Sequence, residues 1–135
     1  MLRKLSLFVA ATMMATVGAL GAGAPASAAI APSQEACRNL GNGNLCIRVV
    51  PGNTLGSTKI TVWYDKNAGA ARYIRLRYSG PGQVGWDEGP FWIYTGDVRG
   101  YIWYNQSLSQ GCYFGQLQDL TDGALGVTSG GYVCY

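Results

Sequence analysis

The sequence predicts an all-β fold: a small antiparallel β-sandwich of the immunoglobulin-like kind, or a barrel, with two disulfides. Apolar and polar residues alternate with period two along most of residues 37–135, and no convincing 3.6-residue period is present. Turn signals recur about every ten residues, as in sandwiches and small barrels. The chain also has 20 Gly, 9 Tyr and 4 Trp in 135 residues, a composition that disfavours helices.

The first 28 residues have the three parts of a secretory signal peptide. Arg3 and Lys4 give a positive start, residues 5–20 are an apolar run, and residues 26–28 (Ala-Ser-Ala) supply a cleavage site. The run is short and rich in small residues, which disfavours a retained membrane anchor. We therefore expect a secreted, extracellular protein, with no membrane association after cleavage.

The mature chain is expected to form one domain. Its 107 residues (135 less 28) are near the common size for a single core, and no composition break divides them. Residues 29–36 contain Pro32 and show no periodicity, so we expect a flexible N-terminal segment there. Residues 37–135 then form a single β-sandwich domain.

Four cysteines lie in the mature chain: Cys37, Cys46, Cys112 and Cys134. An even number in a small exported domain indicates two disulfides. Of the three pairings we favour Cys37–Cys46 with Cys112–Cys134, because each bond closes a short loop or hairpin. A zinc site is the alternative, and it is disfavoured because the chain has no C-x-x-C pair and no histidine.

Two strands are expected near the start of the domain. In residues 45–50, successive side chains alternate between two faces until Pro51-Gly52 ends the run. Residues 59–64 show the same alternation, and Trp63 falls on the face opposite the apolar side chains. Asn67 and Gly69 follow, which predicts a hairpin to the next strand.

Residues 72–78 form the clearest expected strand. Its core face consists of Ile74, Leu76 and Tyr78. Its other face, expected to meet solvent or a partner, consists of Tyr73, Arg75 and Arg77. A hairpin would place Trp63 beside this second face, giving the composition of an interface hot spot. In the alternative, these aromatic and arginine side chains stack on one another in solvent as a cation–π ladder, and no partner binds.

The second half of the domain is expected to contain a long loop at 79–89 and four strands, at 91–94, 101–104, 112–117 and 132–135. Asp122-Gly123 is a turn signal between the last two. In both aromatic strands the alternation leaves one pair of side chains outside the core. We include Trp92 and Trp103 among the outward aromatic candidates.

The composition disfavours catalysis and nucleic-acid binding. The absence of histidine removes the usual Ser-His-Asp and Cys-His systems. Asp87 and Glu88 are adjacent and would point apart, so they do not suit a glycosidase acid pair. Once Arg3 and Lys4 leave with the signal, eight basic residues face seven acidic ones, a net charge of +1.

No cofactor and no metal is expected. Residues 119–123 look like a calcium loop in passing, but the further alternating oxygen ligands and the distal Glu are missing. A plain Asp-Gly turn explains them better.

Outward aromatic and arginine side chains predict a binding module. The candidate residues are Trp63, Tyr73, Arg75, Arg77, Trp92 and Trp103. Such side chains can anchor a protein interface. They can also stack on a polysaccharide, for which Asn105 and Gln106 would be the polar contacts.

The placement of charge favours a protein partner. Residues 37–80 contain seven basic side chains and one acid, and residues 81–135 contain five acids and one base. If the halves form opposite sheets, the surface is dipolar and can orient association with a protein. If the halves interleave, the charges mix.

Short segments around the cysteines carry a family resemblance. They are Ala36-Cys37, residues 43–46 (Gly-Asn-Leu-Cys), the strand at 60–64 and residues 111–113 (Gly-Cys-Tyr). With these, residues 36–135 resemble small exported two-disulfide β proteins of actinobacteria. Within that group the chain is similar to the adaptor subunits of umbrella-shaped antibacterial toxin particles, which link a lectin-like subunit to a scaffold subunit. The resemblance implies a non-catalytic connector and assigns no binding residue.

Small secreted protease or amylase inhibitors are a second comparison. Residues 51–58 or 79–89 would then present a rigid loop to an active site. The Trp-Arg-Tyr motif of amylase inhibitors is absent, which disfavours this alternative.

Overall fold

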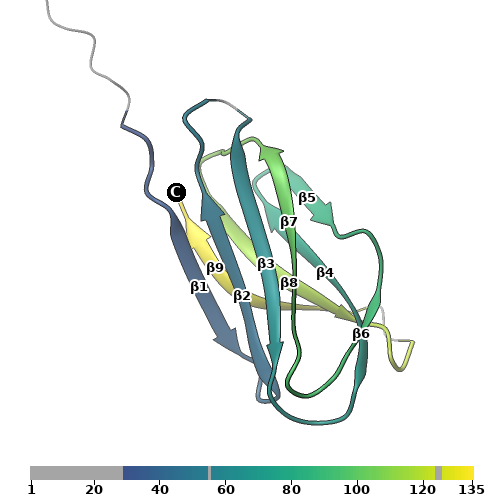
Figure 1. The fold of residues 1–135 in the computed structure, drawn as a ribbon. Coiled ribbons are helices and arrows are strands. Elements are labelled where there is room, and N and C mark those ends of the chain that lie inside the picture. The colour runs from purple at the N-terminus through teal and green to yellow at the C-terminus, as the bar shows by residue number, and fades with distance from the viewer. Residues whose placement is uncertain (1–28, 55, 124–125) are drawn as a thin grey trace, which may run out of the picture.

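The computed structural model describes residues 29–54, 56–123 and 126–135, which form nine strands and no helix (Figure 1). The strands are β1 (Gln34–Asn39), β2 (Gly43–Val50), β3 (Thr58–Lys66), β4 (Arg72–Gly80), β5 (Gln83–Trp86), β6 (Phe91–Ile93), β7 (Val98–Gln106), β8 (Cys112–Asp119) and β9 (Val127–Cys134). The predicted signal peptide lies outside the described residues. Within the described ranges no helix has the length and hydropathy to cross a membrane.

The strands form two antiparallel sheets, which confirms the predicted all-β sandwich. Sheet 1 has the order β1-β2-β3-β7, and sheet 2 has the order β5-β4-β8-β9, with β6 also paired to β4. The two sheets face each other across the core (Figure 1). A constant-type immunoglobulin domain moves its third strand to the opposite sheet. Here β1, β2 and β3 stay side by side, so the strand order differs from that fold.

The connection from β3 to β4 is a crossover between sheets, and the predicted hairpin is wrong. β3 pairs with β2 and β7, whereas β4 pairs with β5, β6 and β8. Asn67 and Gly69 do turn the chain, but the carbonyl of Asn42 accepts the backbone N–H groups of Asn67 and Ala68 and ties the turn to the β1–β2 connection. Each strand has one apolar face, and placing the two in opposite sheets buries these faces against each other.

The core takes alternate residues from both sheets, as the period-two pattern predicted. Its buried members are Leu45, Ile47, Val49, Ile60, Val62, Tyr64, Ile74, Leu76, Tyr78, Ile93, Trp103, Tyr113, Leu117 and Val133. The hydroxyl groups of its tyrosines find partners at the rim: Tyr64 donates to Asn42 and Tyr78 to Gln106. These hydroxyl groups therefore have hydrogen-bond partners although the tyrosine rings are buried.

One side of the sandwich is closed by contacts between β1 and β9. Gln34 Nε2 donates to the carbonyl of Cys134 at 2.9 Å, and Arg38 Nη1 donates to the carbonyl of Ser129 at 3.2 Å. A Cβ at Gly131 would lie 2.1 Å from the carbonyl oxygen of Ala36, so only glycine permits this approach.

The strand β1 begins inside the segment predicted to be flexible. Gln34, Glu35 and Ala36 pair with Val49, Arg48 and Ile47 of β2. Two of these three side chains are polar, and their strand lies at a sheet edge, so no apolar alternation marks it. Residues 29–33 precede the strand.

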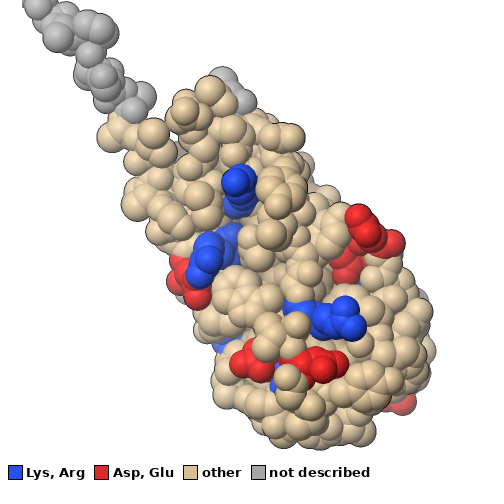
Figure 2. Space-filling view, in the orientation of Figure 1, with Lys and Arg blue, Asp and Glu red and all other residues tan. Residues whose placement is uncertain are grey.

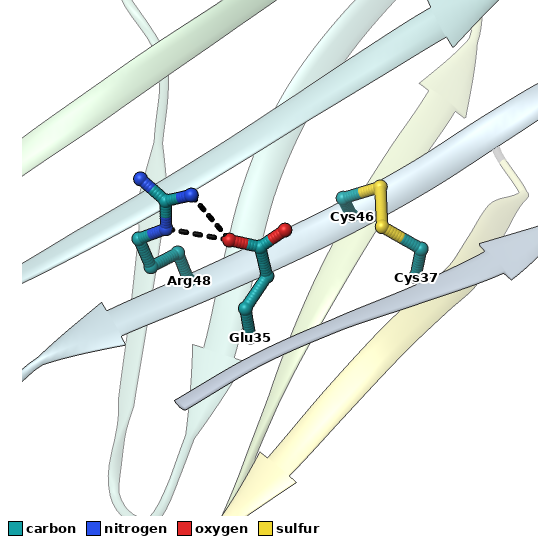
Figure 3. Close-up of a disulfide and its surroundings, with 4 residues drawn as sticks. All are labelled: Glu35, Cys37, Cys46 and Arg48. Atoms are coloured by element: carbon teal, nitrogen blue, oxygen red, sulfur yellow. Dashed lines mark hydrogen bonds and ion pairs between the residues drawn. A yellow bond between two sulfur atoms is a disulfide. The ribbon is translucent and has the colours of Figure 1, made fainter. Parts of the chain in front are cut away.

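Both predicted disulfides are present. Cys37–Cys46 joins directly paired residues of β1 and β2, and Cys112–Cys134 does the same for β8 and β9. Figure 3 shows the first bond on β1 and β2, with the ion pair between Glu35 and Arg48 nearby. Each disulfide therefore reinforces an existing strand pair.

Replacing Gly131 with alanine should destabilise the domain by about 2 kcal/mol or more, because the new Cβ collides with the β1 backbone. Gly126→Ala is the matched control, since a Cβ there meets nothing within 4 Å. Urea unfolding of both variants measures the difference. Equal stability of the two would show that β9 does not approach β1 as described.

Removing the Cys112–Cys134 bond should cost more stability than removing the Cys37–Cys46 bond. The two bonds close sequence separations of 22 and 9 residues. Loop entropy alone then gives a difference of about 0.8 kcal/mol. Chemical denaturation of the two double Cys→Ser variants tests this, and a larger loss for the shorter loop would contradict it.

Candidate functional site

The structure separates the six predicted binding residues into three places. Four of them share the outer face of sheet 2: Tyr73, Arg75, Arg77 and Trp92. Trp63 lies on the outer face of sheet 1, and Trp103 lies in the core. The predicted group is therefore not one patch.

Trp63 is not a neighbour of the β4 arginines, because β3 and β4 belong to different sheets. Its strand places it between Cys46 on β2 and Gly100 on β7. The guanidinium carbon of Arg48 lies 5.7 Å from its ring centroid. The prediction of a joint patch was wrong because period two fixes the face of a residue within its own sheet and does not fix which sheet a strand joins.

Trp103 is only 8% exposed, so its prediction as an outward ring is wrong. It packs edge-on against Tyr78 and Tyr101, with centroids 5.0 and 4.9 Å away. Its Nε1 donates to the carbonyl of Trp86 at 3.0 Å. The outward residues of β7 are instead Ile102 and Tyr104.

The residue that sequence reasoning missed is Trp86. The sequence predicts a loop at 79–89, but residues 83–86 form β5, which pairs with β4. The tight turn at Pro81-Gly82, with a φ of 68° at Gly82, makes the hairpin. The Gly-Pro-Gly sequence before Gln-Val-Gly-Trp was the available signal.

Trp86 begins a row of contacts that crosses sheet 2. In register, it lies beside Arg77, then Gln116 and Ser129. The Arg77 guanidinium carbon is 4.9 Å from the Trp86 centroid, and Arg77 Nε donates to Gln116 Oε1 at 2.6 Å. Gln116 Nε2 then donates to Ser129 Oγ at 3.1 Å. The Arg77 guanidinium is therefore held between the Trp86 ring and the Gln116 amide.

Arg75 also contacts Trp86, with its guanidinium carbon 4.9 Å from the ring centroid. One indole therefore interacts with two guanidinium groups, an arrangement with a cation–π contribution from each. A third of the Arg75 side chain is exposed. The aromatic ring that the two arginines contact is therefore Trp86, whereas the sequence predicts Trp63.

Asp87 holds Arg75 in this position. Its Oδ1 accepts from Arg75 Nε at 3.0 Å, and its backbone carbonyl accepts from Arg75 Nη2 at 2.9 Å. Its Oδ2 accepts from the backbone N–H of Leu76 at 2.8 Å, at the gap between β5 and β6 along β4. Asp87 is 5% exposed, and its burial is compensated by these charge-assisted bonds.

Trp92 and Tyr73 extend the same face toward the other end of β4. They are directly paired, and their ring centroids lie 5.3 Å apart. Trp92 is 48% exposed, which is high for a tryptophan. We call Tyr73, Arg75, Arg77, Trp86 and Trp92 the arginine–aromatic surface.

The positive charge of this surface is only partly neutralised. Arg75 pairs with Asp87, while none of the ion pairs among the described residues involves Arg77. Over the whole domain the basic and acidic halves interleave, because β4 joins sheet 2 and β7 joins sheet 1. Figure 2 shows small, separate groups of both signs on the viewed face. Basic and acidic side chains are therefore mixed over the surface, as expected for interleaved halves.

The adjacent acids Asp87 and Glu88 point to different surroundings, as expected. Glu88 is exposed and accepts from the Tyr101 hydroxyl at 3.3 Å. Partial desolvation, followed by the neighbouring Glu88 carboxylate, raises the pKa of Tyr101. Glu88, Phe91 and Arg99 line a hollow of about 180 Å³ beside β7. Among the described residues no group of three or more metal-ligating side chains is present.

Comparison with known proteins returns no relative. No family model matches the chain, and neither the search of curated proteins nor that of solved structures gives a match.

Asp87→Asn should destabilise the domain by about 2–3 kcal/mol, because an amide replaces one acceptor with a donor facing Leu76 or Arg75. Asp122→Asn is the control, since Asp122 pairs with Arg72 and its side chain is 80% exposed. Its loss should be below about 0.5 kcal/mol. Similar thermal midpoints for the two variants would contradict the role given to Asp87.

Proposed function

We propose that the protein is a secreted, non-catalytic binding module that associates with another extracellular protein through the arginine–aromatic surface. The observation that carries the proposal is the grouping of Trp86, two arginines and the Trp92–Tyr73 pair on one face of sheet 2. Trp, Tyr and Arg dominate the free energy of protein interfaces.

The surface is held in place before any partner arrives. Asp87 fixes Arg75, and Gln116 fixes Arg77, both through hydrogen bonds to Nε. Side chains that are already ordered lose less conformational entropy on binding. This supports a binding role, because long arginine side chains otherwise lose much freedom at an interface.

The chemistry of the surface indicates the chemistry of the partner. Arg77 Nε donates to the neutral amide of Gln116, so its two terminal nitrogens can donate to a carboxylate on the partner. Trp92 offers a half-exposed ring as an apolar anchor next to this charge. A partner surface with an acidic side chain beside an apolar one would complement both.

Extracellular location is supported by the predicted signal peptide together with the two disulfides. An adaptor in a secreted complex, as the family resemblance implies, is one form of such a module. Polysaccharide binding is disfavoured because both guanidinium groups already contact the Trp86 ring. Asn105 and Gln106 also lie on β7 of sheet 1, away from the rings of sheet 2.

Capture from native culture supernatant, followed by binding measurements on the purified partner, tests the proposal. Arg77→Glu and Trp92→Ala should each weaken the complex by about 2 kcal/mol, roughly thirtyfold in Kd, with the thermal midpoint unchanged. Trp63→Ala, on the opposite sheet, is the matched aromatic control and should bind normally.

Two results would overturn the proposal. One is retention of the isolated protein on chitin, cellulose or peptidoglycan that is lost in Trp92→Ala, which would identify a carbohydrate module. The other is a captured partner whose affinity is changed by Trp63→Ala and unaffected by Arg77→Glu.

A further inference from the structure

Among the strands of the described residues, β7 pairs with one neighbour only. It runs for nine residues, Val98–Gln106, and pairs with β3. The outward side chains at its edge include Val98 and Ile102, which are 60% and 41% exposed. A long edge strand with apolar exposed residues is a template for pairing with a further strand.

The register identifies the backbone groups at this open edge. Lys66 donates its N–H to Asp97 and accepts from the N–H of Gly96, so its backbone faces β7. Backbone direction alternates along an antiparallel pair. The β7 residues whose backbone bonds to β3 are therefore Arg99, Tyr101 and Trp103. Those whose N–H and C=O point away from β3 are Val98, Gly100 and Ile102.

Nothing within the described part of the chain takes up those outward groups: no hydrogen bond outside the strand ladders uses the backbone of Val98, Gly100 or Ile102. The other edges differ. β1 and β9 close on each other, and β5 and β6 have only four and three residues. β7 contains neither proline nor lysine, and Arg99 is its one charged residue. The pairing with β3 shifts register between Trp103 and Gln106, where Asn105 has a φ of 56°, so the regular, unprotected part of this edge is Val98–Trp103.

We propose that two copies of this chain associate through β7, antiparallel, on a two-fold axis at Gly100. Gly100 then faces Gly100 of the second copy, where no side chain obstructs the approach. Ile102 lies beside Val98 of the second copy, so the two exposed apolar side chains cover each other. The two copies of sheet 1 become one continuous sheet, and the interface is self-complementary.

The same register gives charge complementarity. Arg99 is opposite Tyr101 of the second copy, and the Tyr101 hydroxyl is the group that donates to Glu88. Arg99 of one copy is therefore close enough to reach Glu88 of the other, which lies beside that Tyr101. Within each copy Arg99 lies over the Phe91 ring, with its guanidinium carbon 5.9 Å from the ring centroid, at the rim of the hollow of about 180 Å³. The two-fold axis repeats this pair, whereas Arg99 never faces Arg99. A second copy is thus a better occupant of this edge than an unrelated strand.

This association goes beyond the proposed function. The arginine–aromatic surface belongs to sheet 2, and the β7 edge belongs to sheet 1. Pairing through β7 leaves both copies of that surface open, and the dimer carries two binding surfaces that can engage a multivalent partner.

Sedimentation velocity of the mature protein over a concentration series tests the proposal. The wild type should show a reversible dimer. Glu88→Arg and Arg99→Glu should each raise the dimer dissociation constant about tenfold or more, since each single change places two like charges together, twice per dimer. The double variant exchanges the charges and should recover at least most of the loss. Both residues are exposed, so the fold should tolerate these changes.

Ile102→Lys tests the strand edge itself and should give a monomer. Val84→Lys, at an exposed position on β5 of sheet 2, is the matched control and should dimerise normally. Far-ultraviolet circular dichroism checks that both variants fold.

A wild type that stays monomeric at its highest soluble concentration overturns the proposal. So does a dimer that is unaffected by Ile102→Lys, or a double variant no better than the single ones. If the protein does not dimerise but the monomer still binds its partner with full affinity, only the dimer proposal fails and the proposed function stands. The reverse result, a dimer without partner binding, would reject only the function.

Discussion

The candidate surface depends on the hydrogen bonds that the buried carboxylate of Asp87 accepts. β5 ends at Trp86 and β6 begins at Phe91, so the edge of β4 that faces away from β8 has no strand partner beside Leu76. Asp87 accepts the Leu76 N–H and the Arg75 guanidinium together, so one side chain replaces the missing ladder and neutralises a charge. Because Arg75 is held there, its guanidinium lies over the Trp86 ring, which the strand register also places beside Arg77.

The sandwich supplies the frame for this arrangement through the packing of two apolar faces. β3 and β4 each have a continuous buried face, and the crossover places the two against each other. The outward faces then lie on opposite sides of the molecule. The proposed binding surface on sheet 2 and the proposed dimer contacts of β7 therefore use different residues.

The sequence was sufficient for the class of fold, the disulfide pairing and the face of most residues within their strands. Ile74, Leu76 and Tyr78 are buried, and Tyr73, Arg75 and Arg77 are outward, because side-chain direction follows from local alternation alone. Which strands join is decided by long-range packing, so Trp63 was placed beside the wrong strand. Trp86 was missed because β5 is four residues long, and Trp103 was misplaced because a two-sided aromatic strand gives no sign of which pair is buried.

Hydrogen exchange of the backbone amides, with and without the captured partner, measures the central claim most directly. The account predicts that binding adds protection to β4, β5 and β6, with the largest change around Arg75–Arg77 and Trp86. Exchange in β2 and β3, which form the opposite sheet, should be unchanged. Protection confined to β2 and β3, with none on β4 and β5, would contradict the assignment of the binding surface to sheet 2.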